Sequence, residues 1–411
     1  MKVYFSGISG TGIGPLAELA YDAGYEVCGS DLMRGAIAPE IDERNISVHY
    51  GEQTGAFLRQ KQAEGVIDWF VYTSALPADH AELLAAQELG IHTSKRDEFI
   101  AKFIEDKKLK MLAVAGTHGK TTTTALLIYA FTRLGIPVSY LIGTTLGWGR
   151  GGNYSTDAKY FIYEADEYDR NFLAYHPFVA AITCVDYDHP DIYPTLGDYQ
   201  GAFAQFEAQS QYVVKNTTVN EKFTLVGELR RRDASIALEV LQYLRSVDDE
   251  INCSDEEIIA VLNDFPGAGR RFERIAEGVY SDYGHHPNEI KATVEMAKEL
   301  RDRDNYTGLA VIYQPHQNTR QHKVRDGYLD AFNGADKVFW LPTYLTREDP
   351  NLEILTPENL ISNLRNPEIA EPAELNDDLA SKILQLKKQG WLILLLTAGP
   401  ADGWLRKNFG D

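Results

Sequence analysis

Short apolar runs alternate with longer amphipathic stretches from one end of the chain to the other. Several of these runs lack the polar–apolar alternation of a half-exposed strand, as is typical of strands buried on both faces. Strands and helices that alternate in this way predict parallel sheets covered by helices, so the expected fold class is α/β. The runs expected to form strands are residues 3–5, 66–72, 111–115, 161–163, 179–185, 309–313, 338–341 and 391–396.

Two segments of distinct composition divide the chain into three parts. Residues 105–110 are rich in charge, and residues 265–271 contain proline and glycine just before a new strand-like segment. With 411 residues the chain is also too long for one compact core. We therefore predict domains at residues 1–109, 110–268 and 269–411.

The charge balance narrows the choice of partners. A formal net charge of −20 and a sequence pI near 4.9 argue against nucleic acid and anionic membranes, since both would need clustered Lys and Arg. The three cysteines lie far apart without a CxxC motif, which indicates neither a disulfide framework nor a zinc site. The N-terminus has no signal-peptide core, and no apolar run is long enough to span a bilayer. We expect a protein of the reducing cytoplasm.

A glycine-rich loop follows the strand expected at residues 111–115 and precedes a helical stretch. This is the context of a phosphate-binding loop, in which backbone N–H groups hold the phosphates. Lys120 would supply positive charge at the transferred phosphoryl group, and the Thr121 hydroxyl would ligate Mg²⁺. The generic motif has glycine where Val114 stands, which leaves a chance loop as the alternative. The predicted ATP site comprises Gly116, Thr117, His118, Gly119, Lys120, Thr121 and Thr122.

Two acidic strand ends are candidates for metal binding. Glu164 follows the strand expected at residues 161–163, and open α/β sheets bind ligands at the carboxyl ends of their strands. An Mg²⁺ ion held by a nucleotide needs such an oxygen ligand. His189 follows the strand expected at residues 179–185 and could bind a second metal ion through a neutral imidazole nitrogen. A solvated strand end and a structural histidine are the alternatives.

A second glycine-rich loop, with Gly10, Thr11 and Gly12, follows the first strand, and Asp31 closes the next strand-like segment. This arrangement resembles a dinucleotide fingerprint and keeps a nicotinamide-dependent oxidoreductase open as an alternative function. Pro15, however, stands where the last glycine of the fingerprint belongs. The same turn can hold the pyrophosphate of another nucleotide, or it can be a purely structural tight turn.

A third group of polar residues lies at and beyond the second boundary. Arg271 ends the boundary segment, and residues 282–287 contain Asp282, Tyr283 and two consecutive histidines, the first of which is His285. Adjacent residues on a loop rarely ligate one metal ion together, and no HExxH motif accompanies them. The two histidines therefore favour substrate recognition over a zinc site.

Taken together, these segments resemble the Mur ligases over nearly the whole chain. The resemblance is specific because so many motifs follow one another in the family's order. Within the family it is strongest to the branch that adds L-alanine to UDP-N-acetylmuramate. The segments that carry it are residues 7–12, 29–31, 73–75, 116–124, 164–167, 188–189, 269–272, 282–287, 314–316 and 319–320.

The resemblance implies a central phosphate-loop ATPase domain with a mostly parallel sheet, flanked by Rossmann-like domains for the UDP-sugar and the amino acid. It implies an ATP-dependent amide-forming ligase of peptidoglycan precursor synthesis. The lactyl carboxylate of UDP-N-acetylmuramate would be phosphorylated by ATP, and the acyl phosphate would react with L-alanine. ATP and Mg²⁺ are the implied cofactors, and a monomer or weak dimer without nucleic-acid or membrane partners is expected.

The resemblance also implies a role for individual residues. Arg271 and Asp282 are expected to face the nucleotide when the domains close, and Asp282 is counted with the phosphate loop among the ATP-binding residues. The implied catalytic residues are Lys120, Glu164, His189 and Arg271. The implied metal ligands are Thr121, Glu164 and His189. The implied substrate-binding residues are Gly10, Thr11, Gly12, Asp31, Ser74, Tyr283, His285 and Arg320.

Two departures from the family pattern concern the central part of the chain. Leu229, Arg230 and Asp233 stand where the family has its His-Asn-x-x-Asn motif, so the pattern breaks on the purine side of the nucleotide. The span between Lys215 and Gly227 is much shorter than the family's. A catalytically weakened nucleotide-binding relative therefore stays open as an alternative.

Two further departures concern the added group. No lysine lies in residues 199–211, where several sister ligases carry a carbamylated lysine, and the alanine-adding branch shares this absence. Gln317 stands where an arginine is expected. Residues 164–169 and 188–193 also resemble the related ligase that attaches a recovered tripeptide to UDP-N-acetylmuramate, which is the second alternative.

Overall fold

The computed structural model describes residues 1–410 apart from nine positions. Its strands form three sheets in two compact units, residues 1–223 with 232–265 and residues 224–231 with 266–411. The mostly parallel sheets with helices between their strands confirm the predicted α/β class. The bounds of the three predicted domains remain a prediction. The positions that are not described are Ala36, Ser74, Ala75, Thr145, Asp188, Pro190, Asp191, Asn216 and Arg347.

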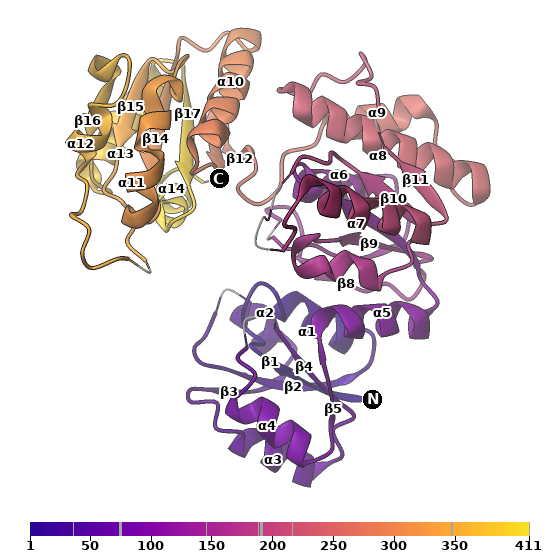
Figure 1. Cartoon of the computed structure of the whole chain (residues 1–411). Helices are drawn as coiled ribbons and strands as arrows, with labels where there is room; N and C mark the ends of the chain where they lie inside the picture. Colours follow the sequence, from indigo (N-terminus) through magenta and orange to yellow (C-terminus); the bar gives the residue numbers. More distant parts are fainter. Residues whose placement is uncertain are drawn as a thin grey trace. The chain divides into compact units, whose positions relative to one another are not determined.

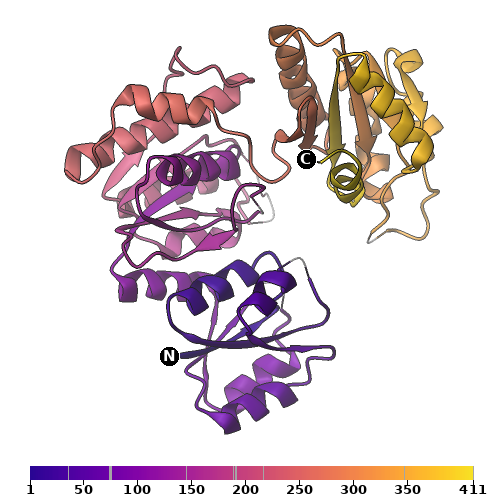
Figure 2. The same cartoon turned by 180° about the vertical axis from the view of Figure 1, so that it is seen from behind.

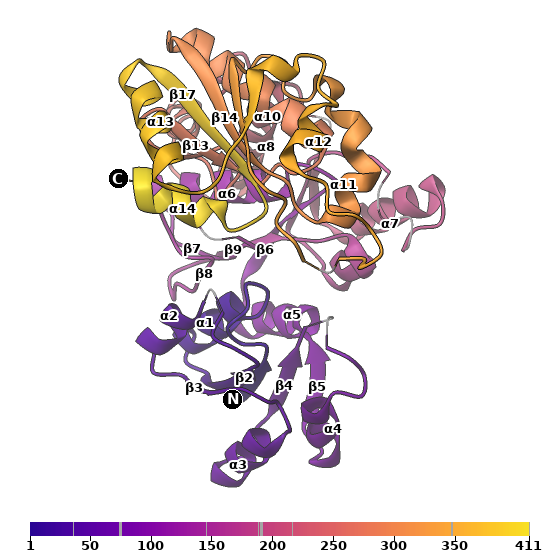
Figure 3. The same cartoon turned by 90° about the vertical axis from the view of Figure 1, so that its left-hand side faces the viewer.

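The first sheet has five parallel strands in the order β3-β2-β1-β4-β5. Helices α3 and α4 cover one face, and α1, α2 and α5 cover the other (Figure 3). The strands are β1 Lys2–Ser6, β2 Glu26–Asp31, β3 Ser47–Tyr50, β4 Trp69–Tyr72 and β5 His92–Lys95. The helices are α1 Gly14–Asp22, α2 Ala38–Glu43, α3 Ala56–Glu64, α4 Ala81–Glu88 and α5 Arg96–Lys107.

The second sheet has the order β11-β10-β6-β9-β7-β8 and is parallel except for β8. Strands β8, β9, β10 and β11 of this sheet are labelled in Figure 1. Because β10, β6 and β9 are neighbours, the loops that follow them meet at one edge of the sheet. The strands are β6 Lys110–Ala115, β7 Val138–Leu141, β8 Gly152–Asn153, β9 Tyr160–Glu164, β10 Val179–Ile182 and β11 Tyr212–Val214. The helices are α6 Lys120–Arg133, η1 Tyr168–Ala174, α7 Leu196–Gln209, α8 Glu228–Val247 and α9 Asp255–Asn263.

Helix α5 joins the first two sheets through a shared hydrophobic core. Phe99 on α5 packs edge-on against Phe5 of β1 at a centroid distance of 5.5 Å. Phe103, one turn later, lies 6.3 Å from Phe161 of β9. Buried apolar side chains of both sheets thus form one continuous cluster. This packing fixes the loops of the first sheet relative to those of the second.

The third sheet has the order β12-β13-β17-β14-β15-β16, with only the β12–β13 pair antiparallel among its described pairs. Helix α10 packs on one face and α13 and α14 on the other, where they appear in yellow in front of the sheet (Figure 2). The strands are β12 Glu273–Ala276, β13 Val279–Asp282, β14 Gly308–Gln314, β15 Lys337–Trp340, β16 Ala370–Pro372 and β17 Trp391–Thr397. The helices are α10 Pro287–Arg303, α11 Asn318–Val324, η2 Arg325–Asp330, α12 Pro357–Ile361, η3 Pro367–Ile369, α13 Asp377–Lys388 and α14 Ala401–Phe409.

The predicted strands recur with small shifts at their ends. The run at residues 66–72 forms a strand only from Trp69, and Val66 is 71% exposed. The backbone N–H of Ile67 bonds to the side chain of Gln62, and that of Asp68 to Lys2, so the chain enters the sheet late. In the part of the chain that the structure describes, no helix combines the length and apolarity that crossing a membrane requires.

Candidate functional site

The loop between β6 and α6 has the backbone geometry of a phosphate cradle. Gly116 and Gly119 have φ angles of +137° and +84°, a region that side chains disfavour. A Cβ atom on Gly119 would also lie 2.6 Å from Oδ1 of Asp233, and one on Gly116 would overlap Thr183. Both glycines are therefore required for the close approach of neighbouring groups, and the exposed His118 lies between them.

Lys120 begins helix α6 and points back at the loop. Its Nζ donates to the carbonyl oxygen of Gly116 at 2.6 Å and to the two carboxylate oxygens of Glu167 at 2.7 and 2.9 Å. Glu167 is fully buried, which raises the pKa of its carboxyl group, while Lys120 acts against that increase. Glu167 was not predicted from the sequence, which favoured Glu164 in the same acidic run. The buried partner of Lys120 became visible only with the fold.

Thr121 and Glu164 form the second pair at this site. The Thr121 hydroxyl donates to Oε1 of Glu164 at 2.6 Å, and the backbone N–H of Gly143 lies 3.4 Å from Oε2. Hydroxyl and carboxylate oxygens are the hard ligands that Mg²⁺ prefers. Across the described residues, no group of three or more His, Cys, Asp or Glu side chains could hold a metal ion by itself. An ion here would need oxygens from a bound phosphate as well.

His189 lies on the same edge, where the sequence placed it. Its Nε2 is 3.6 Å from Oε1 of Glu167, and its ring lies edge-on to Tyr168 at a centroid distance of 5.1 Å. Thr117 closes the loop from the other side, since its hydroxyl donates to the carbonyl oxygen of Asp186 at 2.7 Å. The structure thus brings together the predicted residues of the phosphate loop, Glu164 and His189.

A pocket of about 260 Å³ connects this edge with the glycine loop of the first sheet. Thr11 and Gly12 line it from the β1–α1 loop, and Lys120 and Glu164 line it from the second sheet. Arg96, the first residue of α5, also faces this pocket and was not singled out from the sequence. Two loops that lie more than one hundred residues apart in the chain therefore share one cavity.

Asp31 shapes the glycine loop. Its Oδ2 accepts hydrogen bonds from the backbone N–H of Ser9 at 3.0 Å and from the Ser9 hydroxyl at 2.9 Å. Gly10 donates its N–H to the carbonyl oxygen of Gly7, which closes the turn. Ser74, predicted to bind the sugar nucleotide, lies outside the described residues.

The predicted residues of the second unit gather at the carboxyl end of β13. The Arg271 guanidinium lies 5.3 Å above the ring of Tyr283, whose own ring is 5.6 Å from that of His285. Burial lowers the pKa of His285, and the nearby charges of Arg320 and Arg271 add to this effect. The Arg320 side chain forms no hydrogen bond or ion pair with any described residue. It is available for an anionic ligand.

Asp282 differs from these neighbours because its carboxylate is directed inward. It accepts hydrogen bonds from the N–H groups of Phe272 and Gly284 at 2.7 and 2.8 Å and from the Thr293 hydroxyl at 3.2 Å. Burial raises its pKa. Its predicted contact with ATP remains a prediction, and its visible role is to hold the β13–α10 turn.

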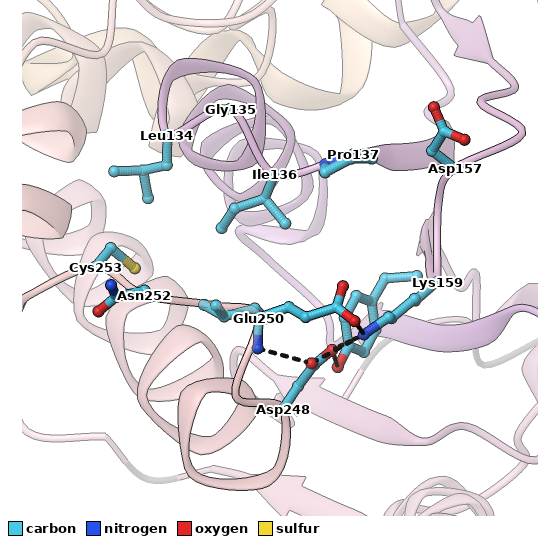
Figure 4. A pocket seen from close by; sticks show the side chains of 12 residues that line it. Leu134, Gly135, Ile136, Pro137, Asp157, Lys159, Asp248, Glu250, Asn252 and Cys253 are labelled. Carbon is cyan, nitrogen blue, oxygen red and sulfur yellow. Dashed lines mark hydrogen bonds and ion pairs between the residues drawn. The ribbon is translucent and has the colours of Figure 1, made fainter.

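Another pocket lies at the opposite ends of α6 and β9 and contains none of the predicted site residues (Figure 4). Apolar side chains such as Ile136 face the loop that follows α8. Lys159 bridges Asp248 and Glu250 at 3.0 and 2.9 Å, and Asp248 also accepts from the Tyr160 hydroxyl at 2.9 Å. The lysine that lines this pocket is thus paired with two of its acidic residues.

A parallel sheet with a strand, a glycine loop and a helix that begins with Lys120 and Thr121 defines a phosphate-loop nucleotide-binding protein. Family models match this assignment. Residues 2–108 match the model of the Mur ligase family, catalytic domain, and residues 114–238 match that of the Mur ligase middle domain. The chain belongs to the Mur ligase family.

Individual relatives agree with the family assignment. The UDP-N-acetylmuramate–L-alanine ligase of Lactiplantibacillus plantarum is 32% identical over 382 residues, which cover 82% of this chain and 83% of that protein. The enzyme of the same name from Roseiflexus castenholzii is 29% identical over 98% of this chain and 95% of its own length.

Solved structures share the fold. The UDP-N-acetylmuramate-alanine ligase of Thermotoga maritima has a TM-score of 0.77 at 21% identity and covers 99% of this chain and 98% of its own. A murein peptide ligase from Psychrobacter arcticus has a TM-score of 0.58, also at 21% identity, and the match covers 99% of this chain and 98% of that one. These likenesses support the three-domain Mur ligase architecture.

Proposed function

We propose that this protein joins L-alanine to the lactyl carboxylate of UDP-N-acetylmuramate at the expense of ATP, in peptidoglycan precursor synthesis. The observation that carries the proposal is the shared pocket, in which Thr11 and Gly12 face Lys120 and Glu164. A glycine loop suited to a sugar diphosphate and a loop suited to a triphosphate would bring carboxylate and γ-phosphate together. Relatives named UDP-N-acetylmuramate–L-alanine ligase align with most of the chain.

The proposed reaction has two steps. One oxygen of the carboxylate forms a bond to the γ-phosphorus, and the bond between that phosphorus and the bridging oxygen breaks, so that ADP leaves with the electron pair. The alanine amine then attacks the acyl carbon. The tetrahedral intermediate collapses with loss of inorganic phosphate and a proton. An acyl phosphate reacts readily with water. The pocket must therefore exclude water until the amine attacks.

The residues of the phosphate loop would stabilise charge in the first step. Backbone N–H groups of residues 116–122 hold the phosphates, and Lys120 offsets charge on the transferred phosphoryl group. Thr121 and Glu164 would hold Mg²⁺ through their oxygens, with His189 as ligand of a second ion. When bound, Mg²⁺ supplies Lewis-acid polarisation of the phosphoryl oxygens.

The second unit would bind the amino acid. The Arg320 guanidinium is a partner for the carboxylate of the incoming amino acid, and Tyr283 and His285 would line the site. Arg271 would contribute a further positive charge. Since burial lowers the pKa of His285, its ring is expected to be neutral at pH 7 and able to accept a proton from the attacking amine.

We further propose that the protein acts in the cytoplasm. Cys28, Cys184 and Cys253 are all free thiols, which fits a reducing compartment. A monomer or weak dimer remains the proposed state.

The test is phosphate release from ATP with Mg²⁺, UDP-N-acetylmuramate and a panel of amino acids, with the product identified by mass. We expect turnover that is highest with L-alanine. A Lys120→Ala, Glu167→Gln double variant, which removes both buried charges, should be inactive. Turnover only with a tripeptide would instead assign the peptide-recycling reaction. Binding of ATP without turnover of any acceptor would assign a nucleotide-binding relative.

A further inference from the structure

Arg96 stands at the junction between the two loops of the shared pocket. It is the first residue of α5 and lines the pocket together with Thr11, Gly12, Lys120 and Glu164. Its Nη1 lies 4.0 Å from the place that a Cβ atom on Gly12 would occupy. A group held between the glycine loop and Lys120 would therefore meet this guanidinium.

The hydrogen-bonding capacity of Arg96 is unused in the described parts of the chain. Its closest charged neighbour is Asp97, with 3.6 Å between Nε and Oδ1, a distance too long for a hydrogen bond. The Arg96 side chain is 28% exposed, toward the pocket that it lines. A guanidinium has five N–H donors in a planar fork that matches a carboxylate. A guanidinium that lines a pocket and has no side-chain hydrogen bond to a described residue points to an oxyanion ligand.

The surroundings hold Arg96 in position. Asp97 is buried, and its Oδ1 accepts hydrogen bonds from the hydroxyls of Tyr175 at 2.8 Å and Tyr163 at 3.3 Å. Those two rings pack edge-on at a centroid distance of 5.3 Å. Because Asp97 is fixed by two tyrosines and attracts Nε, the fork of Arg96 is oriented before any ligand arrives.

We propose that Arg96 binds the carboxylate of the acceptor substrate, the group that ATP phosphorylates. This inference rests on the proposed function. One carboxylate oxygen attacks the γ-phosphorus, and the other stays on Arg96, first as a carboxylate oxygen and then as the carbonyl oxygen of the acyl phosphate. That oxygen becomes negative again when the amine adds, so the same contact stabilises the tetrahedral intermediate.

The sugar diphosphate is the other oxyanion that could reach Arg96. Backbone N–H groups at the start of α1 already suit that diphosphate, whereas the carboxylate must lie within roughly 3.5 Å of the γ-phosphorus to react. Arg96 shares its pocket with Lys120 and Glu164, where the γ-phosphate is proposed. The carboxylate is therefore the favoured ligand.

The test compares two sugar nucleotides that differ in the lactyl ether that bears the carboxylate. UDP-N-acetylmuramate has it and UDP-N-acetylglucosamine lacks it. Calorimetric titration of the full chain should show that Arg96→Gln weakens the affinity for UDP-N-acetylmuramate by about 10- to 100-fold. The affinity for UDP-N-acetylglucosamine should change by less than about 3-fold. Lys102→Gln, on the exposed side of the same helix, is the charge-matched control and should change neither.

Equal weakening of both ligands would place Arg96 at the diphosphate, and no weakening of either would also overturn the proposal. Arg96→Lys guards against a folding defect. It keeps the charge but not the fork, so kcat should fall by more than about tenfold while KM for the sugar nucleotide rises less. If the wild-type protein binds neither nucleotide, the proposed function fails, independently of Arg96.

Discussion

The buried ion pair of Lys120 and Glu167 predicts that removing the lysine alone harms the fold as well as the activity. The Glu167 side chain is 0% exposed and that of Lys120 15% exposed, and their charged atoms lie 2.7 Å apart. Lys120→Ala leaves a carboxylate in surroundings that solvate it poorly. Such a loss costs about 3–5 kcal/mol. We expect about 3 kcal/mol here, since water can enter where the lysine was.

The sign of the pH dependence follows from the pKa of Glu167. Burial raises this pKa, and Lys120 acts against the increase, so Lys120→Ala raises it further. A carboxyl group whose pKa is higher in the folded state makes the fold less stable as pH rises from the unfolded pKa through the folded pKa. The deficit of Lys120→Ala should therefore be largest at pH 8 and should shrink as the pH is lowered.

Thermal unfolding at pH 8 of the wild-type protein, Lys120→Ala, Glu167→Gln and the double variant measures the effect. A loss of about 3 kcal/mol lowers Tm by about 6–12 °C in a unit of this size. The double variant buries no charge and should recover most of the loss while remaining inactive. A Lys120→Ala variant as stable as the wild-type protein at pH 8 would contradict the buried-charge explanation, as would a double variant in which Glu167→Gln restores no stability.

Three other substitutions have defined outcomes. Gly119→Ala should weaken the binding of ATP more than about tenfold in titrations. Gly135 also has a positive φ angle, +70°, but has open space around it, so Gly135→Ala should cost only about 1–2 kcal/mol of stability. Thr124→Val should stabilise the protein to heat by about 1 kcal/mol, because the Thr124 hydroxyl is buried without a partner in the described structure. Burial raises the pKa of Glu18 from 4.5 to about 7, so Glu18→Gln should be more stable than the wild-type protein at pH 8 and similar at pH 5. Glu88→Gln, which replaces an exposed glutamate, is the control for Glu18→Gln.

For each of these substitutions, one result would contradict the prediction. Equal ATP affinity in the two alanine variants would show that Asp233 moves away from Gly119 at no cost. A destabilised Thr124→Val protein would mean that the hydroxyl is bonded through water. A constant stability difference between pH 5 and pH 8 would show that Glu18 does not titrate in this range.

The strand pattern was readable from the sequence because most strands are buried on both faces. Strands β14 and β17 are almost wholly buried, and the corresponding runs at residues 309–313 and 391–396 are apolar without alternation. The phosphate loop was readable for a similar reason, since its glycines meet a local requirement of the backbone. Such local rules need no knowledge of distant contacts.

The order of strands and the docking of α5 could not be read in this way. Lys120 and Glu167 meet because β6 and β9 are neighbours, which no spacing along the chain encodes. The choice between Glu164 and Glu167 depended on the turn after β9, where Asp169 and Arg170 adopt φ angles of +53° and +59°. In the sequence, nothing distinguishes Arg96 from other charged residues at helix starts. Its position in the pocket depends on how α5 packs with the two sheets.

The two carboxylates of the β9 loop divide the work of the site by their surroundings. Glu167 is buried and holds the ammonium of Lys120, which keeps the resting loop close to neutral and the lysine in place. Glu164 is only partly buried and meets the Thr121 hydroxyl, so its free lone pairs face the pocket. A triphosphate that enters must therefore share Lys120 with Glu167. With the proposed Mg²⁺ at Glu164, the negative charge of the triphosphate would be offset by both cations, and binding of nucleotide and of Mg²⁺ would depend on each other.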